Sequence, residues 1–141
     1  MDKLIETREQ KTISEIFSNQ GEAHFRELEK KTLHGFQQDQ SMVIATGGGV
    51  PCFHDNMQFI KNNGLSVFLN VELDDLAKRL YKAQGNKRPL LDKSQSEEAV
   101  IASIKKTYEE RLPFYNQADI QVDGEINVSQ LLWLIDQYMP V

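Results

Sequence analysis

The sequence has little cysteine, no long apolar run and no excess of positive charge. Its 141 residues include one cysteine, Cys52, which excludes an intrachain disulfide, and no group of Cys and His has zinc-site spacing. No apolar run approaches the roughly 20 residues that cross a bilayer, and the charges within the first three residues are unlike a signal peptide. The net charge of −5 gives no bulk attraction to nucleic acid or anionic membranes. We therefore expect one cytoplasmic domain without a metal site formed by the protein.

Apolar periodicity predicts helices that alternate with short strands. The T-x-x-E pattern from Thr12 to Glu15 is a capping box that begins a helix, and after Gly21 a longer helix follows. Strands are expected over residues 42–45, 65–71 and 118–122. A short helix is expected around 57–60, with its end at Gly64, and another at 73–81. A longer helix is expected from 100 to around Pro113, and an amphipathic helix over 131–138. This order predicts an α/β domain with a parallel sheet.

Residues 84–97 break this periodicity. The segment contains glycine, proline, lysines, serines and acidic residues with little apolar pattern. A surface loop of about a dozen residues has a length typical of functional lids, so we expect a lid here.

Three consecutive glycines, Gly47, Gly48 and Gly49, follow the first expected strand. Ligands of open α/β sheets bind outside the carboxyl ends of the strands, and glycine lets backbone N–H groups approach a ligand closely. A tight turn that needs glycine for its backbone angles explains the same residues equally well.

Three arginines are candidates for anion binding. Arg26 shares a helix edge with Glu22 and Glu29, either as a solvated ion pair or as a fork held in place to grip a carboxylate. Arg88, in the expected lid, is either a solvated charge or a group that neutralises a transferred phosphoryl group. Arg111, near a helix end, interacts with the helix dipole or forms a second carboxylate clamp.

Taken together and in order, these motifs resemble the shikimate kinase family. The matching patterns are D-x-x-I-E from Asp2, G-E-x-x-F-R-x-x-E from Gly21, T-G-G-G from Thr46, R-P-L-L from Arg88 and R-x-P-x-Y from Arg111. The resemblance spans essentially the whole chain. It implies phosphorylation of the 3-hydroxyl of shikimate from ATP with Mg²⁺, in the chorismate pathway of aromatic amino acid biosynthesis.

The resemblance also implies roles for the substrate-binding residues. Asp2 would contact the shikimate hydroxyls and accept the proton of the attacking hydroxyl. Arg26 and Arg111 would clamp the carboxylate, with Glu29 holding Arg26. Gly47 to Gly49, chiefly Gly48, would present backbone to the ring.

For the nucleotide, the resemblance implies less. Arg88 would reach the ATP phosphates during transfer, and Arg79 would pack against adenine. None of the eight glycines is followed by lysine, so the G-x-x-x-x-G-K-S/T P-loop of the family is absent from the chain. Without the P-loop, the chain also lacks the backbone cradle for phosphate, the phosphate-binding lysine and the hydroxyl that binds Mg²⁺.

We therefore interpret residues 1–141 as a single, incomplete shikimate kinase-like domain. The expected fold is a P-loop kinase-like three-layer parallel sheet lacking its first two strands, with an empty slot between the strand ending at Thr46 and the strand at 65–71. We expect the missing segment to be encoded upstream of Met1, the complete protein to be a monomer, and this chain alone to be inactive. Alternatives are a non-catalytic shikimate-binding remnant and an inert fragment.

Overall fold

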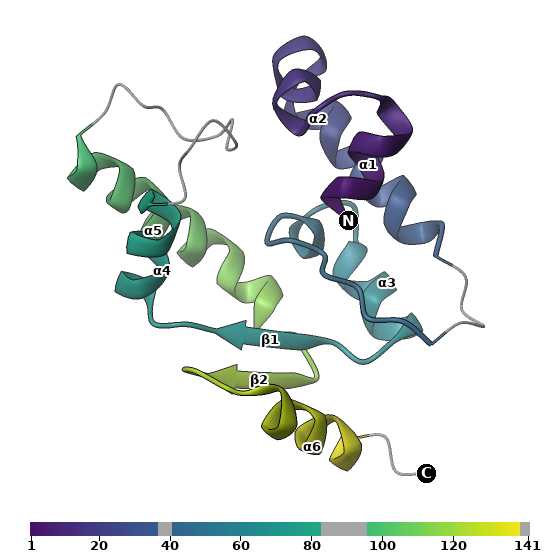
Figure 1. Ribbon diagram of the computed structural model, residues 1–141, viewed down its shortest axis with the longest axis vertical. Coiled ribbons are helices and arrows are strands. Elements are labelled where there is room, and N and C mark those ends of the chain that lie inside the picture. Colours follow the sequence, from purple (N-terminus) through teal and green to yellow (C-terminus); the bar gives the residue numbers. More distant parts are fainter. Residues whose placement is uncertain (37–40, 83–95, 139–141) are drawn as a thin grey trace.

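The computed structural model describes residues 1–36, 41–82 and 96–138, which form helices around a small sheet (Figure 1). In chain order the elements are α1 (Asp2–Glu9), α2 (Ile13–His34), the 3₁₀ turn η1 (Val50–Cys52), α3 (Asn56–Asn63), β1 (Val67–Asn70), α4 (Leu73–Lys82), α5 (Glu97–Tyr115), β2 (Ile120–Asp123) and α6 (Val128–Tyr138). The predicted α/β class is confirmed. None of the helices in these described ranges is long and apolar enough to cross a membrane.

The sheet in the described residues consists of β1 and β2, which run parallel (Figure 1). Val67 pairs with Ile120 at one end of the ladder and Asn70 with Asp123 at the other. Just before the ladder, the carboxylate of Asp119 accepts hydrogen bonds from the backbone N–H and the hydroxyl of Ser66. These bonds fix the register at the point where the two strands come together.

The strand predicted at residues 42–45 is wrong. In the structure the chain from Ser41 to Thr46 belongs to no helix or strand, and Val43 is fully exposed, at 102% of its reference surface. A strand is stable only when its backbone groups pair with a neighbour, and no described residue offers one here. The N-terminal amine of Met1 donates to the carbonyl of Ala45 over 3.0 Å and tethers the end of this segment.

Two apolar clusters stabilise the helices. Ile5, Ile16 and Phe25 join α1 to α2, and a second cluster around Ala77, Val100 and Ile104 joins α4 to α5. The predicted capping box is confirmed, because Thr12 accepts from the backbone of Glu15 while the Glu15 carboxylate accepts from the backbone of Thr12. In Figure 1 the pair α1 and α2 lies at the upper right and the pair α4 and α5 at the left.

Helix α5 does not stop at Pro113, as predicted, but includes it and ends at Tyr115. A proline removes one helical hydrogen bond, a loss that tertiary contacts of the last turn offset. The ring of Tyr115 packs against Phe68 of β1 with centroids 5.0 Å apart. At its other end α5 begins at Glu97 with Ser96 as N-cap. The rest of the predicted lid, 84–95, lies outside the described residues.

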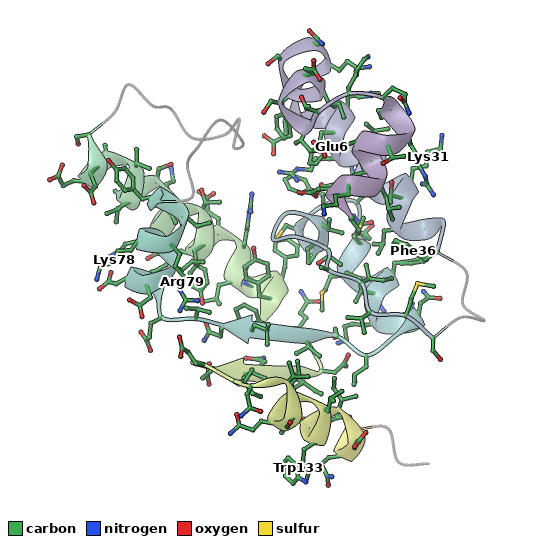
Figure 2. The ribbon with its side chains drawn as sticks, viewed as in Figure 1. Glu6, Lys31, Phe36, Lys78, Arg79 and Trp133 are labelled. Carbon is green, nitrogen blue, oxygen red and sulfur yellow. The ribbon has the colours of Figure 1, made fainter. Side chains whose placement is uncertain are left out.

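The C-terminal helix α6 (Val128–Tyr138) confirms the predicted helix. None of its residues is buried, and Leu132 and Trp133 are 55% and 62% exposed. Trp133 extends from α6 away from the sheet (Figure 2). Helix α6 therefore adds little to the core.

Candidate functional site

A cavity of about 1370 Å³ lies between α2, the glycine loop (Gly47–Gly49), β1 and α5. Its polar corner is formed by Asp2, Glu22, Arg26, Glu29, Gly47, Gly48, Gly49, Arg111 and Tyr115. Its apolar wall is formed by Leu33, Phe36, Met42, Ile44, Leu65 and Val67. The cavity is larger than the roughly 300–1,000 Å³ of typical ligand pockets, and the two linings differ in chemistry. We therefore treat them as two regions.

Arg26 is the buried centre of the polar corner. Its side chain donates from Nε and Nη2 to Glu22 Oε1, at 3.1 and 2.7 Å, and from Nη1 to Glu29 Oε2, at 2.7 Å. Only 5% of the residue is exposed, so the alternative of a solvated surface pair is excluded. Burial disfavours the charged form, but the hydrogen bonds and charges of Glu29 and Glu22 outweigh it and raise the pKa of Arg26. Arg26 is therefore a fixed cation.

The start of this helical segment depends on Gly21. Within α2, Gly21 has φ 80° and ψ 174°, a break from which Glu22 begins a new helical run. Such a φ is disfavoured for residues with a Cβ, so glycine is required here. Because Glu22 and Glu29 lie one turn before and after Arg26 on this run, both carboxylates reach the guanidinium.

Electrostatics link the other charged groups of the corner to Glu29. Burial raises the pKa of Glu29, and the nearby charge of Asp2 raises it further. The positive charges of Arg26 and Arg111 act in the opposite direction. Asp2 of α1 and Arg111 of α5 therefore both lie near this buried carboxyl. Arg111 makes no ion pair with any described residue, which leaves its fork available to a ligand.

The glycine loop needs glycine for two different reasons. Gly47 has φ 78°, which confirms the turn interpretation at that position. At Gly48 and Gly49 glycine is needed because neighbouring side chains lie too close to leave room for a Cβ. A Cβ on Gly49 would lie 2.9 Å from the guanidinium carbon of Arg26, and one on Gly48 would lie 2.8 Å from the hydroxyl of Tyr115. Side chains at these two positions would displace the polar corner.

Cys52 also borders the cavity, with its thiol 3.6 Å from the carbonyl oxygen of Gly48. Burial raises the pKa of the Cys52 thiol, although Arg111 and Arg26 act against the rise. The thiol is therefore neutral at ordinary pH, which does not suit a nucleophile.

The structure does not bring every predicted site residue to this cavity. Arg79 lies on α4, outside the cavity lining, and its guanidinium forms an exposed ion pair with Glu125 at 3.1 Å (Figure 2). Arg88 lies outside the described residues. Tyr115 is the contributor that the prediction omitted, although its position one helical turn after Arg111 was the signal that places it on the same face.

The described residues do not fit a nucleotide with Mg²⁺. None of the glycines within 1–36, 41–82 and 96–138 is followed by lysine, and no three His, Cys, Asp or Glu side chains in these ranges are grouped to hold a metal ion. A phosphate cradle needs converging backbone N–H groups with a lysine, and Mg²⁺ needs oxygen ligands. We therefore derive no step through the nucleotide.

Comparison with known proteins identifies the family of the chain. The family model described as shikimate kinase matches residues 1–133. The chain belongs to the shikimate kinase family. It is 43% identical to a shikimate kinase of Parabacteroides distasonis over 125 residues, covering 89% of this chain and 71% of the relative. It is 46% identical to one of Bacteroides thetaiotaomicron over 118 residues, covering 84% of this chain and 66% of the relative.

Solved structures give the same family. The shikimate kinase of Bacteroides thetaiotaomicron superposes with a TM-score of 0.82 at 37% identity, covering 99% of this chain and 81% of that one. The Acinetobacter baumannii enzyme in complex with shikimate gives 0.81 at 27% identity, covering 99% and 78%. The chain spans about two thirds of the length of the curated relatives that it matches. Shikimate kinases are ATP-binding transferases of aromatic amino acid biosynthesis, so the predicted family and enzyme class are confirmed.

Proposed function

We propose that this chain recognises shikimate for an ATP-dependent kinase that phosphorylates the 3-hydroxyl of the substrate. The observation that carries the proposal is the convergence of Arg26, Arg111 and the glycine loop on one corner of a cavity. Two guanidinium groups beside exposed loop backbone suit a small ring that carries a carboxylate and hydroxyls.

Within this proposal each residue of the corner has a separate task. Arg111, free of ion pairs with the described residues, and Arg26 clamp the carboxylate. Glu29 holds Arg26 through the 2.7 Å bond. Asp2, at the start of α1 and on the cavity lining, contacts the hydroxyls and accepts the proton of the attacking hydroxyl.

The loop and the residues outside the cavity complete the proposal. The backbone of Gly47 to Gly49, chiefly of Gly48, faces the ring. Arg88 would hold the phosphates and Arg79 the adenine of an ATP bound to the complete enzyme.

The apolar wall supports the finer fold proposal, a P-loop kinase-like sheet from which two strands are missing. Met42 and Ile44 from the 41–46 segment line the same cavity as Val67 and Leu69 of β1, and all four side chains are apolar. Parallel strands buried on both faces are apolar in this way. We accordingly expect the phosphate-binding lysine and Mg²⁺ site on polypeptide that pairs with β1, and no turnover by residues 1–141 alone. Shikimate-dependent ADP release by this chain, in a coupled assay, would contradict this.

A second candidate is a shikimate-binding protein without catalysis. It is favoured by one observation, that the polar corner is complete among the described residues whereas a phosphate cradle is not. Binding of shikimate without turnover, even when polypeptide containing a P-loop is supplied, would select it.

The proposal is tested by calorimetry of the chain with shikimate and with its uncharged methyl ester. We expect shikimate to bind and the ester to bind at least about tenfold more weakly, because the ester lacks the charge that the arginines neutralise. Arg111→Ala should abolish the preference for the acid. Lys106→Ala is the matched control, since Lys106 is an exposed cation on the same helix, 3.9 Å from Glu110 and outside the cavity lining. Equal binding of acid and ester by the parent chain would refute the clamp.

A further inference from the structure

The hydroxyl of Tyr115 connects α5 to the glycine loop. It donates to the carbonyl oxygen of Gly48 over 2.7 Å, between residues 67 positions apart in the chain. The only other donor that the described residues bring to this carbonyl is the Cys52 thiol, at 3.6 Å. A thiol is a weak donor, so the hydroxyl dominates the orientation of the carbonyl.

The position of the hydroxyl is itself fixed by the fold. The Tyr115 ring lies 5.0 Å from the Phe68 ring of β1 and 6.3 Å from the Tyr108 ring, measured between centroids. Burial raises the pKa of Tyr115, against the opposing effect of Arg111, so the hydroxyl stays protonated and donates. The side chain therefore cannot easily follow the loop if the loop moves.

A fixed Gly48 carbonyl determines the direction of the next N–H group. The described residues contain no cis peptide bond, and in a trans peptide the C=O and the following N–H point in opposite directions. With the Gly48 carbonyl directed at α5, the N–H of Gly49 is directed away from α5. Tyr115 and Arg111 both lie within 3.5 Å of where a Cβ of Gly48 would be, so the loop rests directly on these two side chains.

We propose that Tyr115 is a positioning residue for shikimate binding, which holds the Gly48–Gly49 peptide in the orientation that presents backbone to the ring. This role rests on the proposed function. Tyr115 does not touch the substrate in this proposal, but acts through the loop. Its loss should therefore weaken binding through loop geometry, not through loss of the fold.

The test compares two variants that each delete one hydroxyl from α5. Tyr115→Phe keeps the ring on Phe68 and removes the bond to Gly48. Tyr108→Phe is the matched control, because the Tyr108 hydroxyl donates to Asn70 Oδ1 at 2.6 Å and not to the loop. We expect Tyr115→Phe to weaken shikimate binding about three- to tenfold, the range of one net hydrogen bond, and Tyr108→Phe to leave it unchanged. Both variants should melt at similar temperatures.

A second measurement reads the loop directly and needs no ligand. In ¹⁵N-labelled chain, the amide signals of Gly48 and Gly49 should move in Tyr115→Phe and stay in place in Tyr108→Phe. Unmoved signals in Tyr115→Phe, or equal losses of shikimate affinity in the two variants, would overturn the positioning role. If the parent chain does not bind shikimate, the proposed function fails, and the amide signals still decide whether Tyr115 orients the loop.

Discussion

The polar corner and the apolar wall face the same cavity but are held in place differently. In the corner, Arg26 is bound by two carboxylates, the loop abuts its guanidinium, and Tyr115 holds Gly48. On the wall, residues 41–46 pair with no described strand and Val43 is wholly exposed. Side chains with direct partners keep their geometry locally, whereas an apolar strand needs a neighbour. The ligand-binding geometry of the polar corner can therefore be in place while the apolar wall still lacks a neighbouring strand.

The largest effect is expected from Gly49→Ala in the corner. The new Cβ would collide with the guanidinium of Arg26, which its bonds to Glu22 and Glu29 prevent from yielding. We expect shikimate affinity to fall more than about tenfold and stability to fall by about 2 kcal/mol. Calorimetry and urea unfolding measure these two quantities.

Gly64→Ala is the control for this substitution, since a Cβ there meets nothing within 4 Å and the backbone is extended, at φ −176°. It should leave binding and stability close to the parent values. If Gly49→Ala behaved in the same way, Arg26 would not be held as tightly as its contacts indicate.

A smaller effect is expected where the sheet begins, from Asp119→Asn. Hydrogen bonds from Ser66 lower the pKa of Asp119 in the folded chain. A carboxyl with a lowered pKa stabilises the fold above its unfolded pKa, near 4, and the contribution is lost as pH falls through the folded value. At pH 7 the variant should be less stable because the bonds from Ser66 to a charged carboxylate are weakened. The loss should be only about 1 kcal/mol, because the Asp119 side chain is largely exposed.

Urea unfolding at pH 7 and near pH 3 measures this difference, which should narrow in acid. Asp136→Asn provides the control, because Asp136 is exposed on α6 and makes no ion pair with the described residues. A difference between the Asp119 variant and the parent that grew in acid would contradict the assigned direction.

The smallest effect is expected from Val43→Asp on the open side. An exposed valine contributes little, so stability should change by less than about 0.5 kcal/mol. Val122→Asp is the contrasting control, because Val122 is buried in β2 at 7% exposure and an unpaired charge there should cost at least about 2 kcal/mol. A comparable loss at Val43 would mean that this side chain is covered in solution.

Features that depend on neighbouring residues could be predicted from the sequence. The capping box of Thr12, the turn at Gly47 and the approach of Glu22 and Glu29 to Arg26 all follow from spacing within one or two helical turns. The alternation of helices and strands followed from apolar periodicity in the same way. For such features the relevant partner is already in the local pattern.

Features that depend on distant residues could not be predicted. The strand at 42–45 required a partner that periodicity cannot supply, and the helix continues past Pro113 because Tyr115 contacts β1 and the glycine loop. The R-x-P-x-Y motif placed Tyr115 one helical turn after Arg111 but did not identify what its hydroxyl contacts. Only the fold showed that its hydroxyl meets Gly48.

The break at Gly21 has a consequence for which chemical variants the corner would accept. A Cβ at this position meets nothing within 4 Å, so space is not what excludes a side chain there. The obstacle is the sign of the φ angle, 80°, which disfavours L-amino acids and suits their mirror images. A D-alanine introduced by chemical synthesis would adopt this backbone without strain, whereas L-alanine would not. Position 21 therefore discriminates by chirality and not by size.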